Sequence, residues 1–152
     1  MSAGFLGTAA PASADLVLLL EVVIGVGLLL GAVLARRKRY RAHAWCQCSI
    51  VLLNAVLIAV AMIPSFYGRV RPKIPEKLGR SFYALATAHA AVGSLAEIGG
   101  LYVALAAGTN FLPEYLRLTN YKAWMRSLLV LWWLALLLGL ATYIRWYVPL
   151  SR

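Results

Sequence analysis

Long apolar runs alternate with short polar segments along this chain. Four such runs cover residues 14–35, 42–66, 82–107 and 128–147. A helix of about 20 apolar residues crosses a hydrocarbon core of about 30 Å, so each run is long enough to span a bilayer. The pattern therefore predicts an all-α polytopic membrane protein, a bundle of four transmembrane helices that forms a single domain over residues 1–152.

The composition supports the membrane assignment and indicates which partners the chain is expected to bind. Hydrophobic residues make up 62% of the chain and charged residues 13%, about half the share of about 25% in soluble domains. A formal net charge of +10 would also suit nucleic acid, but the basic residues gather at the ends of the runs, where lipid headgroups lie. We therefore expect membrane lipids as partners and no nucleic acid.

The basic block at residues 36–41 sets the expected orientation. It places five Lys or Arg residues in six positions, and short loops dense in Lys and Arg stay in the cytoplasm. Both termini then lie outside, in the periplasm of a bacterial cell with the protein in the inner membrane. The total bias is small, with eight basic residues inside and seven outside. The expectation thus depends on the density of this one block.

Prolines mark the expected boundaries of the middle spans. Pro64 lacks a backbone N–H and is expected to kink or end the second span. Pro75 followed by Glu76 is typical of a helix start, which predicts that the third helix begins there. Residues 112–126 mix Leu, Tyr and Trp with charged residues and are expected to form an amphipathic helix on the cytoplasmic face.

Polar side chains within the runs are the functional candidates, because ionisable groups are costly in lipid. On the second span, His43, Gln47 and Asn54 fall within about 40° of one another at about 100° per residue. That stripe must face other helices, because lipid cannot satisfy it. On the third span, His89 shares a stripe of small residues with Gly93 and Gly100, which predicts a close helix–helix contact.

Two glutamates extend this set of buried polar groups. Glu21 lies about 10 Å below the outer surface at 1.5 Å per residue, close to the level of His89, so the two side chains can meet. Glu97 lies about 80° round the third span from His89, with Asn54 between their levels. The alternative to a functional role is that these groups only join helices, at about 1 kcal/mol for each contact.

The two histidines raise the question of a haem. Axial ligation by both would need ligating nitrogens about 4 Å apart, given Fe–N bonds of about 2 Å like other His–metal bonds. His43 and His89 differ in membrane depth by about 15–20 Å, so they are not expected to hold one haem within this chain. A single histidine that ligates a haem or chlorophyll shared with a partner remains the open alternative.

His43 and Cys46 form a candidate metal site. They are three residues apart on one helix face, and imidazole with thiolate suits Cu(I) or Zn. Cys48 points about 140° away from His43, and cysteines are common in buried helices, which favours a structural role. The two cysteines are too close on one helix for a disulfide of normal geometry.

Four short motifs, taken in order and spacing, resemble a known family. They are Arg41-Ala42-His43, Thr87-Ala88-His89, Tyr121-Lys122-Ala123-Trp124-Met125-Arg126 and Gly139-Leu140-Ala141-Thr142-Tyr143. Over about residues 16–147 the chain is similar to the small membrane family catalogued as domain of unknown function 420, which includes maturation factors of haem–copper cytochrome oxidases. The resemblance implies a helical bundle without catalytic activity of its own, a link to cytochrome oxidase biogenesis, and intramembrane histidines relevant to haem or copper.

Of the family's histidines, only His43 and His89 have counterparts here. Members often carry another histidine at the outer end of the second span and one just before the last span. This chain has Ser65-Phe66 and Asn120-Tyr121 in those regions. The departure counts against a multi-histidine metal site and favours a structural or subunit role.

The leading hypothesis is a non-enzymatic accessory or assembly component of a respiratory or other electron-transfer complex. The alternative is a cofactor-binding membrane subunit in which His89 ligates haem or chlorophyll. A small transporter is less favoured, because no inverted repeat and no span broken at its middle is visible. A larger membrane protein complex is the expected partner, in contact with the Trp132-Trp133 pair and Leu-rich face of span four or with the polar stripe of span two.

Overall fold

Four helices long and apolar enough to cross a membrane form the computed structural model, which describes residues 4–108, 113 and 119–149. They are α1 (Ala12–Arg36), α2 (Tyr40–Leu57), α5 (Ser81–Gly108) and α6 (Tyr121–Tyr147). Between α2 and α5 the chain forms the short segments η1 (Ile58–Met62), α3 (Ile63–Ser65), η2 (Phe66–Val70), η3 (Arg71–Lys73) and α4 (Ile74–Lys77). The predicted all-α bundle of four spanning helices is confirmed, and each predicted span lies within an observed helix.

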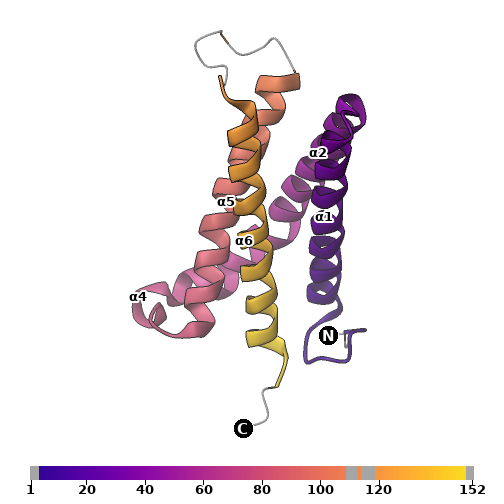
Figure 1. Cartoon of the computed structure of the whole chain (residues 1–152). Helices are drawn as coiled ribbons and strands as arrows, with labels where there is room; N and C mark the ends of the chain where they lie inside the picture. The colour runs from indigo at the N-terminus through magenta and orange to yellow at the C-terminus, as the bar shows by residue number, and fades with distance from the viewer. Residues whose placement is uncertain (1–3, 109–112, 114–118, 150–152) are drawn as a thin grey trace.

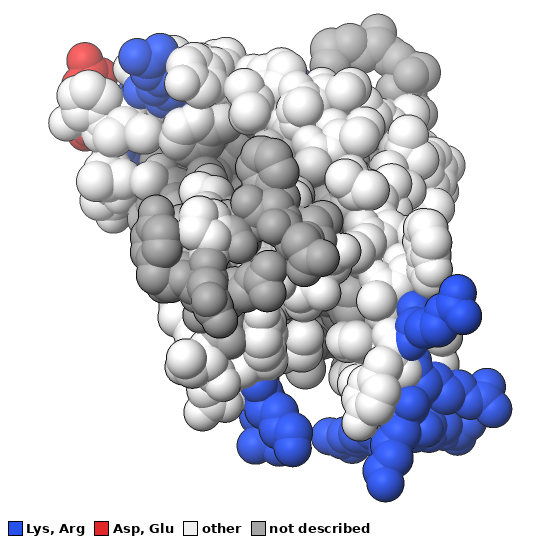
Figure 2. All heavy atoms as spheres, turned by 90° about the horizontal axis from the view of Figure 1, so that it is seen from above, with Lys and Arg blue, Asp and Glu red and all other residues white. Residues whose placement is uncertain are grey.

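The helices pair as two hairpins (Figure 1). α1 packs along α2 and α5 packs along α6, and the hairpins meet where α1 touches α6 and α2 touches α5. Residues 4–10, α4 and the end of α6 lie at one end of the bundle, and the α1–α2 turn lies at the other. Seen from the end with that turn, most of the visible Lys and Arg side chains gather at one corner, by the turn (Figure 2).

The second span continues well beyond its predicted end at residue 66. It runs from Tyr40 to Lys77 and includes one π-helical segment on each side of Pro64. A proline removes an i→i−4 hydrogen bond. The i→i−5 bonds of a π turn, such as Ile63 N–H to Ile58 O, keep the neighbouring backbone paired. Pro64 therefore does not end the helix.

A helix starts beside Pro75-Glu76 as predicted, but it is the short α4, and the third spanning helix α5 begins only at Ser81. These two residues belong to the single turn α4, and a turn over residues 78–80 separates α4 from α5. Gly79 in that turn disfavours a continuous helix. Helix α5 then starts with the carbonyl of Arg80, which accepts hydrogen bonds from the N–H groups three and four residues later.

α6 begins at Tyr121, seven positions before its predicted apolar run at residue 128. Asn120 caps it by accepting a hydrogen bond from the N–H of Ala123 at 3.2 Å. Residues 121–126 are therefore the first turns of the spanning helix, and the separate amphipathic helix predicted over 112–126 is wrong for this part. Residues 112 and 114–118 lie outside the described residues.

Glycines on α1 allow α2 to approach closely. Gly27 and Gly31 are four residues apart, and a Cβ atom at either would overlap the side chain of Ile50 or Gln47, respectively. Small residues at this spacing permit close packing of membrane helices. The close approach brings the polar stripe of α2 against the backbone of α1.

Trp132 fixes α6 against α5. Its side chain is buried, its Nε1 donates to the carbonyl of Ala96 at 3.0 Å, and its ring lies 3.5 Å from the Cβ position of Gly100. The prediction that Gly100 faces protein is confirmed. Trp132 is inside the bundle, so it is not available for the lateral contact predicted for the Trp132-Trp133 pair. Trp133 is half-buried against Gly25 of α1, and for this residue the lateral contact stays a prediction.

Gly93 behaves differently from Gly100, although both belong to the same predicted stripe. No atom lies within 4 Å of its Cβ position, so the close contact predicted there is wrong. The glycine lines a hollow between the helices instead. A stripe of small residues permits a close contact, but the positions of the neighbouring helices decide where it forms.

Candidate functional site

A wide groove opens in the half of the bundle that holds residues 4–10 and the end of α6. Its volume is about 1160 Å³, and its walls come from α1, the later part of the second span, α5 and α6. The lining is mostly apolar and includes the polar side chains Glu21, Asn54, His89 and Thr142. Ligand pockets usually measure about 300–1,000 Å³, so the groove could hold a ligand of considerable size.

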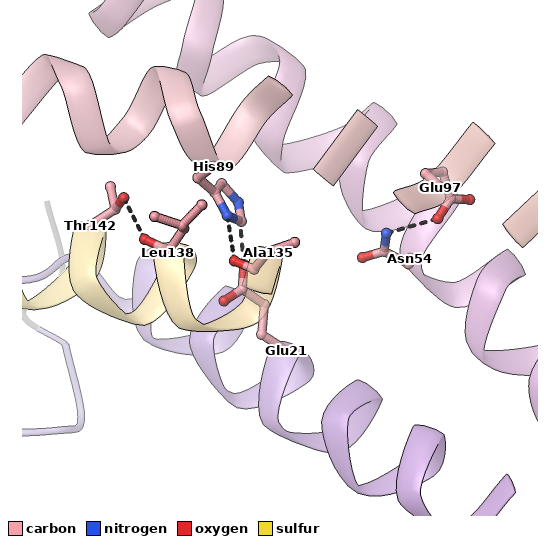
Figure 3. A network of polar contacts seen from close by, with 7 residues as sticks. All are labelled: Glu21, Asn54, His89, Glu97, Ala135, Leu138 and Thr142. Carbon is pink, nitrogen blue, oxygen red and sulfur yellow. Dashed lines mark hydrogen bonds and ion pairs between the residues drawn. The ribbon is translucent and has the colours of Figure 1, made fainter. Parts of the chain in front are cut away.

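Glu21 on α1 and His89 on α5 meet at the wall of this groove (Figure 3). The imidazole Nε2 lies 3.7 Å from the carboxylate Oε1, and the two side chains are 20% and 9% exposed, respectively. The predicted proximity is confirmed, at a distance longer than a hydrogen bond. A Cβ atom at Gly139 of α6 would lie 2.7 Å from Glu21 Oε2 and 3.0 Å from His89 Cε1. Three helices therefore converge on this pair.

The backbone of α6 fixes the other nitrogen of His89. Nδ1 lies 2.9 Å from the carbonyl oxygen of Ala135 (Figure 3). A carbonyl can only accept, so Nδ1 carries a hydrogen and donates it. Nε2 is then free to share a proton with Glu21 or to ligate a metal, because ligating histidines commonly donate their other N–H to such an acceptor.

A second polar contact joins α2 to α5. Asn54 Nδ2 donates to Glu97 Oε2 at 2.9 Å, away from the Glu21–His89 pair (Figure 3). Glu97 is buried, and within the described part of the chain its Oε1 has no hydrogen-bond partner. Gln47 makes a long contact of 3.5 Å from Nε2 to the carbonyl of Leu28. Gln47, Asn54 and Glu97 therefore each connect two helices through a polar contact.

His43 and Cys46 both reach back to α1. His43 Nδ1 donates to the carbonyl of Gly31 at 2.8 Å, and Cys46 Sγ donates to the carbonyl of Gly27 at 3.4 Å. Cys46 and Cys48 are free thiols. Among the residues that the structure describes, no three His, Cys, Asp or Glu side chains form a group that could hold a metal ion.

The two histidines lie at different levels of the bundle. His43 contacts Gly31 of α1, and His89 contacts Glu21 of the same helix. Ten helical residues separate Glu21 from Gly31, a rise of about 15 Å. This arrangement agrees with the expectation that His43 and His89 cannot ligate one haem.

The polar stripe of span two faces α1 and α5 within the bundle. His43 and Gln47 face α1, and Asn54 faces α5. The prediction that the stripe faces other helices is confirmed. The suggestion that it also contacts a larger complex stays a prediction, because the three side chains are only partly buried.

Sequence reasoning missed the polar cluster at the end of the groove. The Tyr143 hydroxyl donates to Asp15 Oδ1 at 2.5 Å and lies 2.8 Å from Thr8 Oγ1, and Asp15 Oδ2 accepts from the N–H of Leu6 at 2.9 Å. These contacts fold residues 4–10 over the start of α1. A carboxylate at a helix start was a visible signal, but its tyrosine partner lies 128 residues away.

Gly31 and Gly139, which also make close contacts, were missed as packing sites. The Gly27-x-x-x-Gly31 spacing on α1 was readable from the sequence. The role of Gly139 depends on three helices meeting, which the sequence does not reveal.

No protein-family model matches the chain, and no curated protein or solved structure matches it.

Proposed function

We propose that the protein is a non-enzymatic accessory or assembly component of a membrane electron-transfer complex, linked to haem–copper oxidase. One observation carries the proposal: two of the motifs behind the family resemblance meet in space. His89, which ends the motif Thr87-Ala88-His89, lies beside Gly139, which begins the motif at residues 139–143. Both positions lie next to the side chain of Glu21. Residues 50 positions apart in sequence thus form one intramembrane site, which supports a shared task for the motifs.

The outward face of α6 is the proposed contact with the larger complex. Val130 and Leu137 are 69% and 58% exposed, and Leu134 between them is 46% exposed. These side chains recur at three- and four-residue intervals, so they form one apolar stripe. Such a stripe packs against a helix of another membrane protein as readily as against lipid.

The test is co-purification with site-specific cross-linking. A photo-reactive residue in place of Leu137 should cross-link to an oxidase subunit, and the same residue in place of Leu29 on the exposed face of α1 should not. Deletion of the gene should lower the assembled oxidase, measured from its haem absorption in membranes. The proposal would be refuted if neither position cross-links to another protein and the amount of assembled oxidase is normal after the gene is deleted.

A second candidate function is a cofactor-binding subunit in which His89 ligates haem or chlorophyll. The observation in its favour is the hydrogen bond from Nδ1 to Ala135, which orients the ring as in many ligating histidines. The groove beside His89 has the size and apolar lining that a macrocycle needs. The fit is incomplete, because Nε2 faces the Glu21 carboxylate at 3.7 Å and would have to share that side with the macrocycle's metal.

An absorption spectrum of the purified protein separates the two candidates. A Soret or chlorin band that disappears in a His89→Ala variant and persists in a His43→Ala variant would favour the cofactor subunit. A colourless protein that still cross-links to the oxidase would favour the accessory role.

A further inference from the structure

Basic side chains stand at the mouth of the groove. Arg69 lines the groove, and its Nη1 donates to the hydroxyl of Tyr147 at 2.9 Å. Arg71 lies over the ring of Tyr67, another lining residue, with its guanidinium carbon 4.8 Å from the ring centroid. The hydroxyl of Tyr147 and the ring of Tyr67 position the two guanidinium groups without forming an ion pair with either of them.

No carboxylate neutralises these arginines within residues 4–108, 113 and 119–149, where the one ion pair is Glu21 with His89. Both arginines are exposed, and Lys73 follows two residues after Arg71. The mouth of the groove therefore presents a concentrated positive charge beside an apolar channel.

The interior of the groove matches one leaflet of a bilayer in length. Along α6 it extends from Tyr147 to Trp132, fifteen residues apart, which corresponds to about 22 Å. One leaflet contributes about 15 Å of hydrocarbon, and its headgroups lie beyond that. The groove thus reaches from the level of the headgroups, where Arg69 stands, to about the middle of the bilayer.

The groove wall is apolar and open at the level between these ends. Leu16 of α1 and Val60 of the second span line it and are 51% and 72% exposed. Gly93 of α5 also lines it, and no atom of another helix lies within 4 Å of its Cβ position. A flexible hydrocarbon chain would find apolar contacts on both sides of the groove.

We propose that the groove binds one anionic phospholipid. One of its acyl chains lies along α6 toward Trp132, and its phosphate is held by Arg69 and Arg71. The positive mouth selects an anionic headgroup over a zwitterionic one, because the cationic amine of the latter would meet the same two arginines. This inference does not depend on the proposed function, since it needs no partner protein.

The experiment is native mass spectrometry of the full chain in mild detergent. The protein is titrated with phosphatidylglycerol or with phosphatidylcholine of identical acyl chains, and the lipid-bound fraction is measured. Wild-type protein should bind one phosphatidylglycerol more tightly than phosphatidylcholine. The variant Arg69→Gln should weaken phosphatidylglycerol binding about fivefold, since one basic residue contributes about that factor at an anionic surface. It should weaken phosphatidylcholine binding by a smaller factor, because the choline charge already offsets the phosphate charge of that lipid.

Matched variants locate the lipid. Gly93→Leu and Val60→Trp should each weaken binding of both lipids, because their side chains fill the groove. Arg39→Gln removes a basic residue at the opposite end of the bundle and should leave binding unchanged. The unfolding temperature of each variant confirms that it is folded, and two independent filling variants guard against the failure of one.

Several outcomes would overturn the proposal. Equal affinity for the two lipids, or an equal effect of Arg39→Gln and Arg69→Gln, would show that the mouth does not select the headgroup. Unchanged binding in both folded filling variants would place the lipid elsewhere. Displacement by soluble glycerol phosphate would show an anion site without a chain, and a haem or chlorin band in the purified protein would show a different occupant.

Discussion

His89 of α5 and Glu21 of α1 approach to 3.7 Å inside the bundle, between imidazole Nε2 and carboxylate Oε1. The two side chains can meet there only because residue 139 of α6 is a glycine, whose position lies beside both. Neither hairpin contains the whole arrangement, since α1 belongs to one and α5 and α6 to the other. The contact therefore reports on how the two hairpins dock.

The variant Gly139→Ala should destabilise the bundle by about 1–3 kcal/mol, the usual cost of overpacking. The added methyl group would lie 2.7 Å from Glu21 Oε2, so the pair would have to move apart. Gly93→Ala is the control, because its Cβ meets no atom within 4 Å and should change stability little. Reversible unfolding in mixed micelles measures both, and equal stabilities of the two variants would contradict the packing described.

Coupling between Glu21 and His89 should be measurable in a double-mutant cycle. Glu21→Gln and His89→Phe should give a coupling free energy of about 0.6 kcal/mol, the average for polar contacts between membrane helices. The control cycle pairs Glu21→Gln with His43→Phe, whose side chain contacts α1 about 15 Å further along. That cycle should be additive within about 0.5 kcal/mol. A coupling energy near zero in the first cycle would mean that the pair is merely adjacent.

The positions of the four spans could be predicted from the sequence because the bilayer sets their length. Any apolar run of about 20 residues must form backbone hydrogen bonds within itself, so it is a helix whatever its neighbours are. The end of the second span was predicted less well. Proline removes one backbone hydrogen bond locally, and here the π turns around Pro64 continue the helix to Lys77.

The polar contacts were predictable as far as depth and helical face determine them. The helical rise places Glu21 and His89 at one level, and the face shared by His43, Gln47 and Asn54 identifies a stripe that faces other helices. The choice of neighbour was not predictable, because sequence periodicity gives the direction of a side chain but not which helix stands there. The groove was invisible for the same reason, since it exists only where helices separate.

Trp132 offers a test of the α5–α6 hairpin. The variant Trp132→Phe keeps an aromatic ring beside Gly100 but loses the Nε1 donor to the carbonyl of Ala96, at a cost of about 1 kcal/mol. Trp124→Phe at the exposed start of α6 is the matched control, and it should change stability by less than about 0.5 kcal/mol. Urea or detergent unfolding followed by far-UV circular dichroism gives both values. Equal stability of the two variants would show that the buried indole N–H contributes nothing.

The orientation in the membrane is the last expectation to test. The α1–α2 turn holds the densest basic cluster and lies at the opposite end of the bundle from α4 and its neighbouring basic residues. The density of Lys and Arg near the span ends governs insertion, so the turn should be cytoplasmic and the α4 end periplasmic.

In a background with Cys46 and Cys48 replaced by serine, a cysteine at Lys73 should react with a membrane-impermeant maleimide on intact spheroplasts. A cysteine at Arg39 should react only after the membrane is permeabilised. The two positions are both exposed, so access to the reagent differs only through the membrane. The reverse labelling pattern would mean that the basic residues at the α4 end outweigh the turn, and the groove would then open toward the inner leaflet.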